Sequence, residues 1–296
     1  MDRAVYETIT QVLSDNPNVR MAAELSLREL VKQPEYPISL ARMMLSQELD
    51  VPKRVTLKNY ISTNWATDSA KFVGPELKPE AKAVVRELAF NGLSDASNKI
   101  RVVSASIVSK IAHDDWPEAW PNLFDLLISL LKSDNINQVH GALRVMNEFV
   151  NHDISEHQFP RVANTLLPEL ARIIKSEDAN NSKLVYSYRT RGRAVSIFRQ
   201  CIEILYMYKE EHPEPTELYI AQNIAGWLEN LLKILTHRII NNNNDNCLEE
   251  YGLKLDVIKC LNSLIQYYPK ILSQYLISLL EPVWTDLFDQ RERYPL

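Results

Sequence analysis

Histidine and aspartate stand together at two places in this chain, where such side chains could hold a metal ion. One run covers residues 113–115 (His-Asp-Asp), and the other joins residues 152–153 (His-Asp) with His157. Protein zinc sites place His, Cys and carboxylate ligands at defined spacings, such as two histidines four positions apart around a glutamate. Neither run has that spacing, and both fall at expected helix ends, where polar caps are common. We therefore expect no metal ion.

Signatures of catalysis are missing as well. The chain has no nucleophile elbow, no phosphate-binding P-loop and no kinase motif set. Carboxylates do occur in adjacent pairs at 210–211 and 249–250, but neighbours on a helix point apart and form a solvated face. A triad set by geometry alone leaves no motif, so a helical enzyme stays as a third hypothesis, and it would need a closed pocket. We expect no enzyme activity and no cofactor.

Composition narrows the possible partners. The net charge is −5 and the pI is about 5.8, which argues against direct nucleic-acid binding and suits basic partners. The cysteines are odd in number and lack metal spacing, so we read Cys201, Cys247 and Cys260 as reduced thiols of a cytosolic or nuclear protein. The start of the chain lacks the apolar segment of a signal peptide. Apolar stretches such as 123–131 are too short to cross a membrane.

Three stretches share one pattern: a polar turn, then an arginine, then an apolar helical run. They begin at residues 16, 50 and 97, and their arginines are Arg20, Arg54 and Arg101. Two helices in a repeat of about 40 residues are typical of HEAT and armadillo solenoids. Such repeats stack into a curved surface that usually binds proteins. The pattern therefore predicts an all-α fold, a HEAT-repeat α-solenoid in which antiparallel helix pairs form a right-handed superhelix.

Apolar residues at helical spacing place the helices in pairs across residues 1–296. The expected pairs are 3–14 with 18–32, 37–49 with 52–65, 79–92 with 98–113, 117–132 with 136–151, 159–175 with 189–209, and 216–236 with 247–268, followed by a last helix at 270–289. This makes about six and a half repeats. The 6 glycines argue against phosphate loops and turn-rich β folds, and most of the 15 prolines fall where helices begin or end.

Local signals refine these boundaries. Gly92 is expected to cap the helix that ends there, and Asp115 to cap the N-terminus of a helix that begins with Trp116-Pro117. Residues 177–187 and 241–246 lack an apolar face and predict mobile loops. The last helix has a wide apolar face without a polar capping helix after it. Because solenoids need such caps for solubility, we expect a fragment of a longer protein.

Several segments resemble the importin-β type of nuclear transport receptor. Residues 57–65 (Leu-Lys-Asn-Tyr-Ile-Ser-Thr-Asn-Trp) are similar to a helix of that family's N-terminal domain. Residues 111–121, with Trp-Pro-Glu-Ala-Trp-Pro, resemble the turn of a later repeat. Residues 139–145 and 189–195 extend the likeness over nearly the whole chain. The Trp-Pro string is the more specific part, whereas an Asn-rich loop like 241–246 is not typical of the family.

The resemblance implies a function. Receptors of this family are superhelices of about twenty HEAT repeats, so this chain would be roughly the first third, with the importin N-terminal domain at about 18–100. They bind Ran-GTP through the second helices of the first repeats, contact nucleoporins and carry protein cargo from cytoplasm to nucleus. The implied cargo is basic, such as core histones and ribosomal proteins. No cofactor, membrane or direct nucleic-acid contact is implied.

Particular residues become candidates for Ran binding on this basis. Lys58 and Asn59 lie on the second inner helix, and a solvated inner face is the alternative reading for both. Acidic positions expected on inner helices, Glu24, Glu148 and Asp153, could meet basic surfaces of Ran or cargo. We do not assign cargo-binding residues from the sequence.

The remaining motifs favour structural roles. Trp116 and Trp120 are expected to pack between neighbouring repeats, with cargo contact as the alternative. Arginines at 189, 191 and 193 could hold an acidic partner, but an ion pair to the next repeat and a solvated helix start are the simpler reading. His140 lies inside a helix and is expected to be packed or hydrogen-bonded. A HEAT scaffold of another class, such as a phosphatase regulatory subunit, remains the alternative function.

Overall fold

We describe the protein from a computed structural model. It describes residues 1–68, 70, 72, 74–152, 159–175, 186–237, 246–281 and 284. These residues form helices and connecting loops, with no strand among them, which confirms the all-α prediction. The chain packs as two compact units, residues 1–149 and 150–296.

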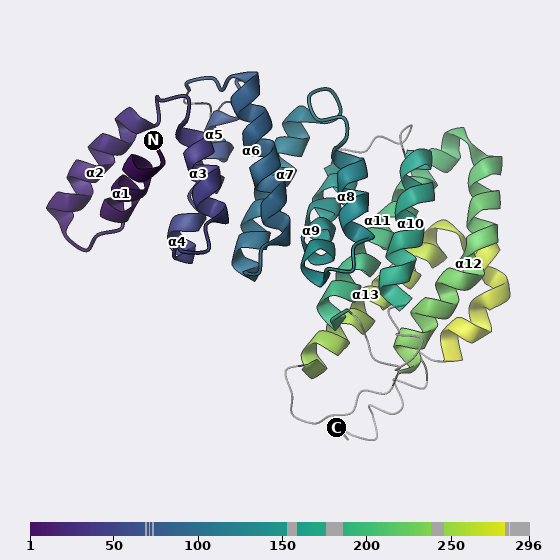
Figure 1. The fold of residues 1–296 in the computed structure, drawn as a ribbon. Coiled ribbons are helices and arrows are strands. Elements are labelled where there is room, and N and C mark those ends of the chain that lie inside the picture. The colour runs from purple at the N-terminus through teal and green to yellow at the C-terminus, as the bar shows by residue number, and fades with distance from the viewer. Residues whose placement is uncertain are drawn as a thin grey trace. The chain divides into compact units, whose positions relative to one another are not determined.

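The first unit is a series of short helices, which Figure 1 shows in chain order. Its elements are α1 (Asp2–Val12), α2 (Pro17–Leu30), α3 (Tyr36–Leu45), α4 (Val51–Arg54), α5 (Leu57–Asn64), α6 (Pro79–Asn91), the 3₁₀ turn η1 (Gly92–Ser94), α7 (Asn98–Asp115), α8 (Leu123–Leu131) and α9, which runs on to His152 (Ile136–His152). Helix α1 packs on α2, α3 on α5, and α6 on α7. First helices also pack on first helices (α1 on α3, α3 on α6), and second on second (α5 on α7).

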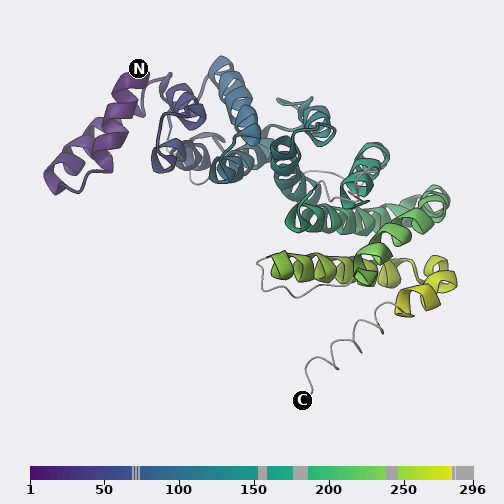
Figure 2. The same cartoon turned by 60° about the horizontal axis from the view of Figure 1, so that its bottom comes forward.

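The second unit continues with longer helices. Its elements are α10 (Phe159–Lys175), α11 (Tyr188–Glu211), α12 (Pro213–Thr236), α13 (Asn246–Tyr267), α14 (Pro269–Leu272) and η2 (Ser273–Tyr275), and residues 276–281 are helical too. The pairs are α10 with α11 and α12 with α13. In Figure 2 the second helices α11 and α13 run side by side, and among the described helices they pack on each other most extensively.

The apolar stripes that predicted these helices form the core. Val139, Leu143, Met146 and Val150 of α9 are all buried. In the second unit, the stripe of α13 is buried in the same way at Val257, Leu261, Leu264 and, just past the helix end, Tyr268. Burying side chains of this size stabilises a fold by about 1.5–3 kcal/mol each, so the helix pairs are held together mainly by these stripes.

Three predicted helices differ from the structure, and one of them is the helix expected at 270–289, which the 3₁₀ turn η2 interrupts at Ser273–Tyr275. The helix expected at 52–65 is divided into α4 and α5 at Val55 and Thr56, where the Thr56 hydroxyl donates to the Lys53 carbonyl oxygen. Such a side-chain bond offers the backbone an alternative to the helical ladder. The helix expected from residue 117 begins only at Leu123, because the N–H groups of Ala119 and Trp120 both donate to the Asp115 carbonyl oxygen and form a turn.

The two predicted caps have different outcomes. Gly92 is the C-cap of α6, as expected, but it keeps right-handed helical geometry with φ of −64°. Its glycine serves close packing, since a Cβ there would lie 2.2 Å from the Ser104 hydroxyl oxygen. The prediction for Asp115 is wrong: it is the last residue of α7 and not an N-cap, and its carboxylate is committed to a buried contact described below.

Only parts of some predictions can be compared. The loops expected at 177–187 and 241–246 lie almost entirely outside the described residues, as does the end of the helix expected at 270–289.

Candidate functional site

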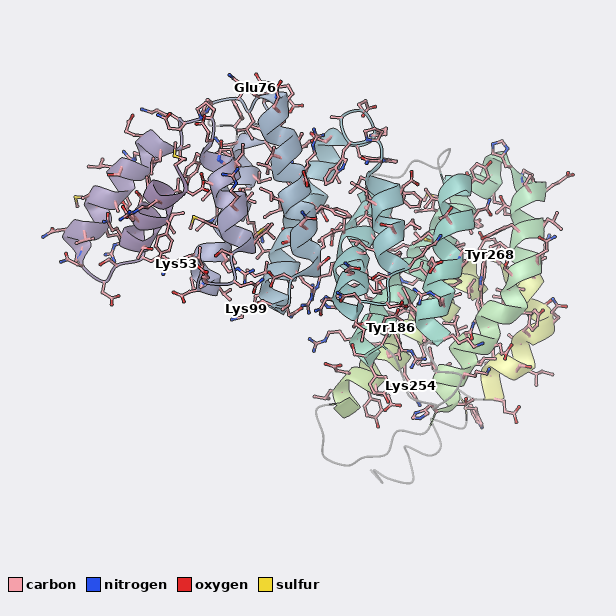
Figure 3. All side chains as sticks on the ribbon, in the orientation of Figure 1. Lys53, Glu76, Lys99, Tyr186, Lys254 and Tyr268 are labelled. Atoms are coloured by element: carbon pink, nitrogen blue, oxygen red, sulfur yellow. The ribbon has the colours of Figure 1, made fainter. Side chains whose placement is uncertain are left out.

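A cation of the second helix closes five of the described helix pairs. It lies in the first half of that helix, or in the short α4 that precedes α5, and it donates to a main-chain carbonyl at, or just beyond, the end of the first helix. The bonds are Arg20 to Ser14 (3.2 Å), Arg54 to Met44 (2.8 Å), Arg101 to Asp95 (2.6 Å), Arg191 to Ile174 (2.8 Å) and Lys254 to Leu235 (2.9 Å). Figure 3 labels Lys254, which lies in the first half of α13. The last carbonyls of a helix lack partners within it and carry partial negative charge, so a cation stabilises them.

A buried ion pair then joins the second helix pair to the third. The Arg54 guanidinium donates to the Asp95 carboxylate, and these side chains are 4% and 2% exposed. Asp95 also accepts from the Gln47 side-chain amide at 3.0 Å and from the Ser97 backbone N–H at 2.7 Å. Charges buried this deeply need such partners to offset the loss of water. Arg54 therefore has a structural role and is not available to a ligand.

Asp115 makes a second buried junction in the first unit. Its carboxylate accepts the indole N–H of Trp65 at 3.0 Å and pairs with Arg86 at 3.3 Å. Arg86 also donates to the Ala119 carbonyl oxygen. Burial raises the pKa of Asp115, while the bond from Trp65 and the charge of Arg86 lower it, and burial has the larger effect. The turn after α7 is thus tied to the end of α5 and to α6.

The two tryptophans of this turn pack between helix pairs, as expected. Trp116 meets Phe149 of α9 edge-on, with ring centroids 4.8 Å apart. The ring centroid of Trp120 lies 6.3 Å from that of Phe90 in α6, and Trp120 is 7% exposed. Trp120 is therefore part of the core, and Trp116 is half-buried.

The three arginines of α11 are not one site. Arg191 is buried and makes the capping bond described above. Arg189 is exposed and pairs with Glu249 of α13 at 3.1 Å, which is the ion pair to the next repeat that the sequence suggested. Arg193 is half-buried. Because these side chains face different surroundings, they do not form a common pocket for an acidic partner.

The predicted Ran-binding residues lie on second helices, but on different ones. Glu24 is on α2, Lys58 and Asn59 are on α5, and Glu148 is on α9, and all four are exposed. Lys58 and Asn59 share one turn of α5. Among the described residues, no hydrogen bond or ion pair joins one of these candidates to another, and Asp153 lies outside the described residues.

Helix α2 has a feature that the sequence reasoning missed. It packs on α1, and among its residues only Ala23 is fully buried. Met21 and Leu25 are 65% and 58% exposed, on either side of Glu24. Exposed apolar side chains that gather on one helix are typical of a binding surface. The apolar spacing of Met21 and Leu25 is visible in the sequence. The same kind of spacing predicts buried helix faces elsewhere in the chain, so it did not indicate that these two side chains are exposed.

An apolar pocket in the second unit also went unpredicted. It lies between the first helices α10 and α12, against α11, and has a volume of about 160 Å³. The pocket is lined by Ala163, Asn164, Leu205, Tyr208, Pro215, Thr216 and Tyr219. A space of this size accepts about one apolar side chain, and the lining offers few polar groups to a ligand that is itself polar.

Potential metal ligands and thiols are scattered in the described part of the chain. Within it, no three His, Cys, Asp or Glu residues are grouped to hold a metal ion. His157 lies outside the described residues. His140 accepts from Arg101 at 3.3 Å, as a packed histidine would. The thiols of Cys201 and Cys260 are fully buried, and burial raises the pKa of Cys260 to about 12. None of the described helices is both long enough and apolar enough to span a bilayer.

Comparison with known proteins agrees with this geometry. Over 96% of the chain, it is 27% identical to Importin subunit beta-5 of Schizosaccharomyces pombe, and over 99% it is 27% identical to Importin-9 of Drosophila melanogaster. It spans only 29% and 28% of those two proteins. The solved structure of the exportin Cse1 in its cargo-free, cytoplasmic state matches 96% of the chain with a TM-score of 0.71, at 15% identity and over 32% of its own length.

The repeated helix pairs have the fold of a HEAT-repeat α-solenoid, and the structural neighbours of the chain include the exportin Cse1 and yeast importin-beta (Kap95p). Residues 23–95 match the importin-beta N-terminal domain. The chain is thus similar over nearly its whole length to importins, and it contains a match to the importin-beta N-terminal domain. Its relatives include importins and an exportin, Exportin-2.

Proposed function

We propose that this chain is the Ran-binding segment of a nuclear import receptor. The observation that carries the proposal is the importin-beta N-terminal domain at 23–95, together with the exposed apolar face of α2. A solved structure of the related Kap95p, with a TM-score of 0.62, is described in complex with RanGDP. On this chain, Ran-GTP would bind the exposed sides of the second helices.

The proposed contacts combine apolar area with charge. Met21 and Leu25 would supply a hydrophobic centre on α2, and Glu24 between them would meet a basic group of Ran. Lys58 and Asn59 on α5, Glu148 on α9 and Asp153 would contribute polar contacts around that centre. Exposed charges at the edge of an interface act mainly on association rate and selectivity, so the apolar pair would supply more of the affinity.

Charge reversal and apolar truncation separate these roles. The double variant E24K/E148K should weaken Ran-GTP binding and slow association, whereas L25A should mainly speed dissociation. The variant E87K is a matched control, because Glu87 is also exposed but lies on the first helix α6. Calorimetry and stopped-flow binding would measure the effects. If E24K/E148K binds as tightly as the unaltered chain, these two contacts are wrong.

We further propose that the pocket between α10 and α12 receives an apolar side chain of a nucleoporin. The related Kap95 is known in complex with Nup1, in a structure with a TM-score of 0.66 to this chain. Support on this chain is the apolar lining and the size of the space. Filling it with A163L should reduce binding of a Nup1 fragment without changing Ran affinity, and Leu218 of α12, which is exposed outside the pocket lining, gives the control L218A.

The cargo would be basic proteins such as core histones and ribosomal proteins, and the receptor would pass between cytoplasm and nucleus. Support comes from the net charge of −5 and from the importin relatives. Binding of Ran-GTP would release cargo because the two ligands favour different states of the receptor, which is reciprocal coupling between sites. Histone affinity, measured with and without Ran-GTP, tests the sign of that coupling. Tighter cargo binding with Ran-GTP would instead support an export receptor, the alternative that the Exportin-2 relatives favour.

A HEAT-repeat scaffold of another class remains the more distant alternative. A pulldown with Ran loaded with GTP or GDP separates it from the receptor. Equal capture of the two forms, or of neither, would favour the scaffold.

A further inference from the structure

Helix α2 buries much less of its surface than the second helices that follow it. Ala23 is its only fully buried residue, although the helix has 14 residues. The shorter α5 buries Leu57, Tyr60, Ile61 and Asn64, and half of the residues of α7 are buried. Helices α5 and α7 pack on each other and on first helices, whereas among the described helices α2 packs to a comparable extent only on α1. Few buried contacts are typical of a segment that opens locally.

The side chains of α2 do not offset this small buried area by polar contacts to other helices. In the described part of the chain, their hydrogen bonds and ion pairs stay within α2 and the turns beside it: Arg20 with Ser14 at 3.2 Å, Ser26 with Ala22 at 3.1 Å, and Glu29 with Lys32 at 2.7 Å. Each joins residues no more than six positions apart. All of these bonds therefore remain possible when α2 leaves α1.

The helices before and after α2 in the chain are anchored. Helix α1 packs on α3, and the Asp2 carboxylate accepts from the Ser39 hydroxyl of α3 at 2.6 Å. The ammonium group of Lys53, in α4, lies 5.4 Å from the ring centroid of Tyr6 in α1. On the other side, Tyr36 is the first residue of α3 and is 4% exposed. Residues 13–35, which we call the α2 strap, therefore run between two fixed helices.

We propose that the α2 strap separates from α1 as a unit, while α1 stays packed on α3 and α4. An opening that progressed along the chain would free α1 before α2 or together with it, and the anchors predict the reverse order. A separated α2 is a helix of 14 residues in water, where helices of that length are marginal, so its amides lose most of their protection.

This equilibrium gives the surface of α2 two states. Packing inside the chain sets their populations, whether or not Ran binds. Met21 and Leu25 lie on the strap, so a partner that binds them in the docked state shifts the strap toward that state.

Amide hydrogen exchange of the 296-residue chain, without any partner, tests the order of opening. The amides of residues 20–30 should exchange about a hundred-fold faster than those of residues 6–12, which should resemble those of residues 102–115 in α7. Equal exchange in α1 and α2, or faster exchange in α1, would overturn the proposal, because the strap would not open by itself. Exchange in α2 as slow as in α7 would overturn it too, because the strap would stay docked.

Two neighbouring alanines provide a matched pair of variants. Both A22G and A23G lower the helix propensity of α2 by the same amount, but Ala22 is exposed and Ala23 is buried. A23G should therefore speed the exchange of residues 20–30 about four-fold more than A22G does, because only A23G removes a buried methyl group. Unchanged exchange at residues 102–115 shows that both variants fold. Equal effects of the two substitutions would overturn the proposal, since docking on α1 would then not limit the opening.

Discussion

The indole N–H of Trp65 donates to the carboxylate of Asp115 across 3.0 Å, although 50 positions separate the two residues in the sequence. Trp65 follows the end of α5 and is 1% exposed, and Asp115 ends α7. The bond therefore fixes the ends of two neighbouring second helices, α5 and α7. Helix α5 carries the proposed Ran contacts Lys58 and Asn59, and α7 packs beside it. Arg86 holds the same carboxylate from the first helix α6.

Removing this donor should destabilise the first unit. W65F keeps an aromatic ring but loses a hydrogen bond to a charged acceptor, which contributes about 1.5–3 kcal/mol. We expect the free energy of unfolding to fall by about that amount in urea titrations. A double-mutant cycle with D115A, which removes the acceptor, isolates the bond. Additive effects of W65F and D115A would show that the two side chains do not interact.

The stability of the unaltered chain relative to D115N should depend on pH. Burial raises the pKa of Asp115 above its ordinary value of 3.8, so the folded state takes up a proton at a higher pH than the unfolded state. The ionised carboxylate therefore costs stability at neutral pH, and the cost is relieved as the pH falls through the folded-state pKa toward 3.8. Melting temperatures of both proteins from pH 7 to 4 should shift in favour of the unaltered chain. A constant difference across that range would contradict the burial effect.

Two arginines of α11 should differ sharply in their contribution to stability. R191M removes a buried cation that donates to the Ile174 carbonyl oxygen, and it should lower the free energy of unfolding by about 1.5–3 kcal/mol. R189M removes a solvent-exposed pair with Glu249, and it should cost less than about 1 kcal/mol. Chemical denaturation of the two variants side by side gives the comparison. Equal losses would mean that the capping bond of Arg191 contributes no more to the free energy of unfolding than the exposed ion pair of Arg189.

Two helical glycines should respond to alanine in opposite directions. At Gly141 of α9 a Cβ would lie 2.2 Å from the Leu93 carbonyl oxygen, so G141A must displace backbone and should cost about 1–3 kcal/mol. At Gly226 of α12 a Cβ would meet nothing within 4 Å, so G226A should stabilise by about 0.5–1 kcal/mol. Thermal melts read out both signs, and a stabilising G141A would show that α9 can move away from η1.

Local sequence patterns predicted most helices because each one buries a stripe that its own spacing reveals. Val139 and Leu143 of α9 are examples. Contacts between distant residues could not be predicted in this way. Asp115 has the sequence context of an N-cap, and only the position of Trp65 and Arg86 explains why its carboxylate is buried instead.

The candidate surfaces were harder to predict than the fold. Periodicity identifies an apolar face but does not say whether another helix covers it. Leu25 of α2 and Leu143 of α9 have similar contexts, yet one is 58% exposed and the other is buried. The resemblance of residues 57–65 located Lys58 and Asn59 on a second helix, and the structure leaves both exposed. The pocket between α10 and α12 is lined by residues of three helices, so no single segment of the sequence could predict it.

The capping bonds span very different stretches of chain. The bonded residues are 6 and 10 positions apart for Arg20 and Arg54, but 17 and 19 apart for Arg191 and Lys254. The same type of capping bond thus closes helix pairs whose connecting segments differ severalfold in length. New sequence can accumulate between two helices while their mutual alignment stays constant. Insertions between the two helices of a pair are therefore expected to leave the packing of that pair intact.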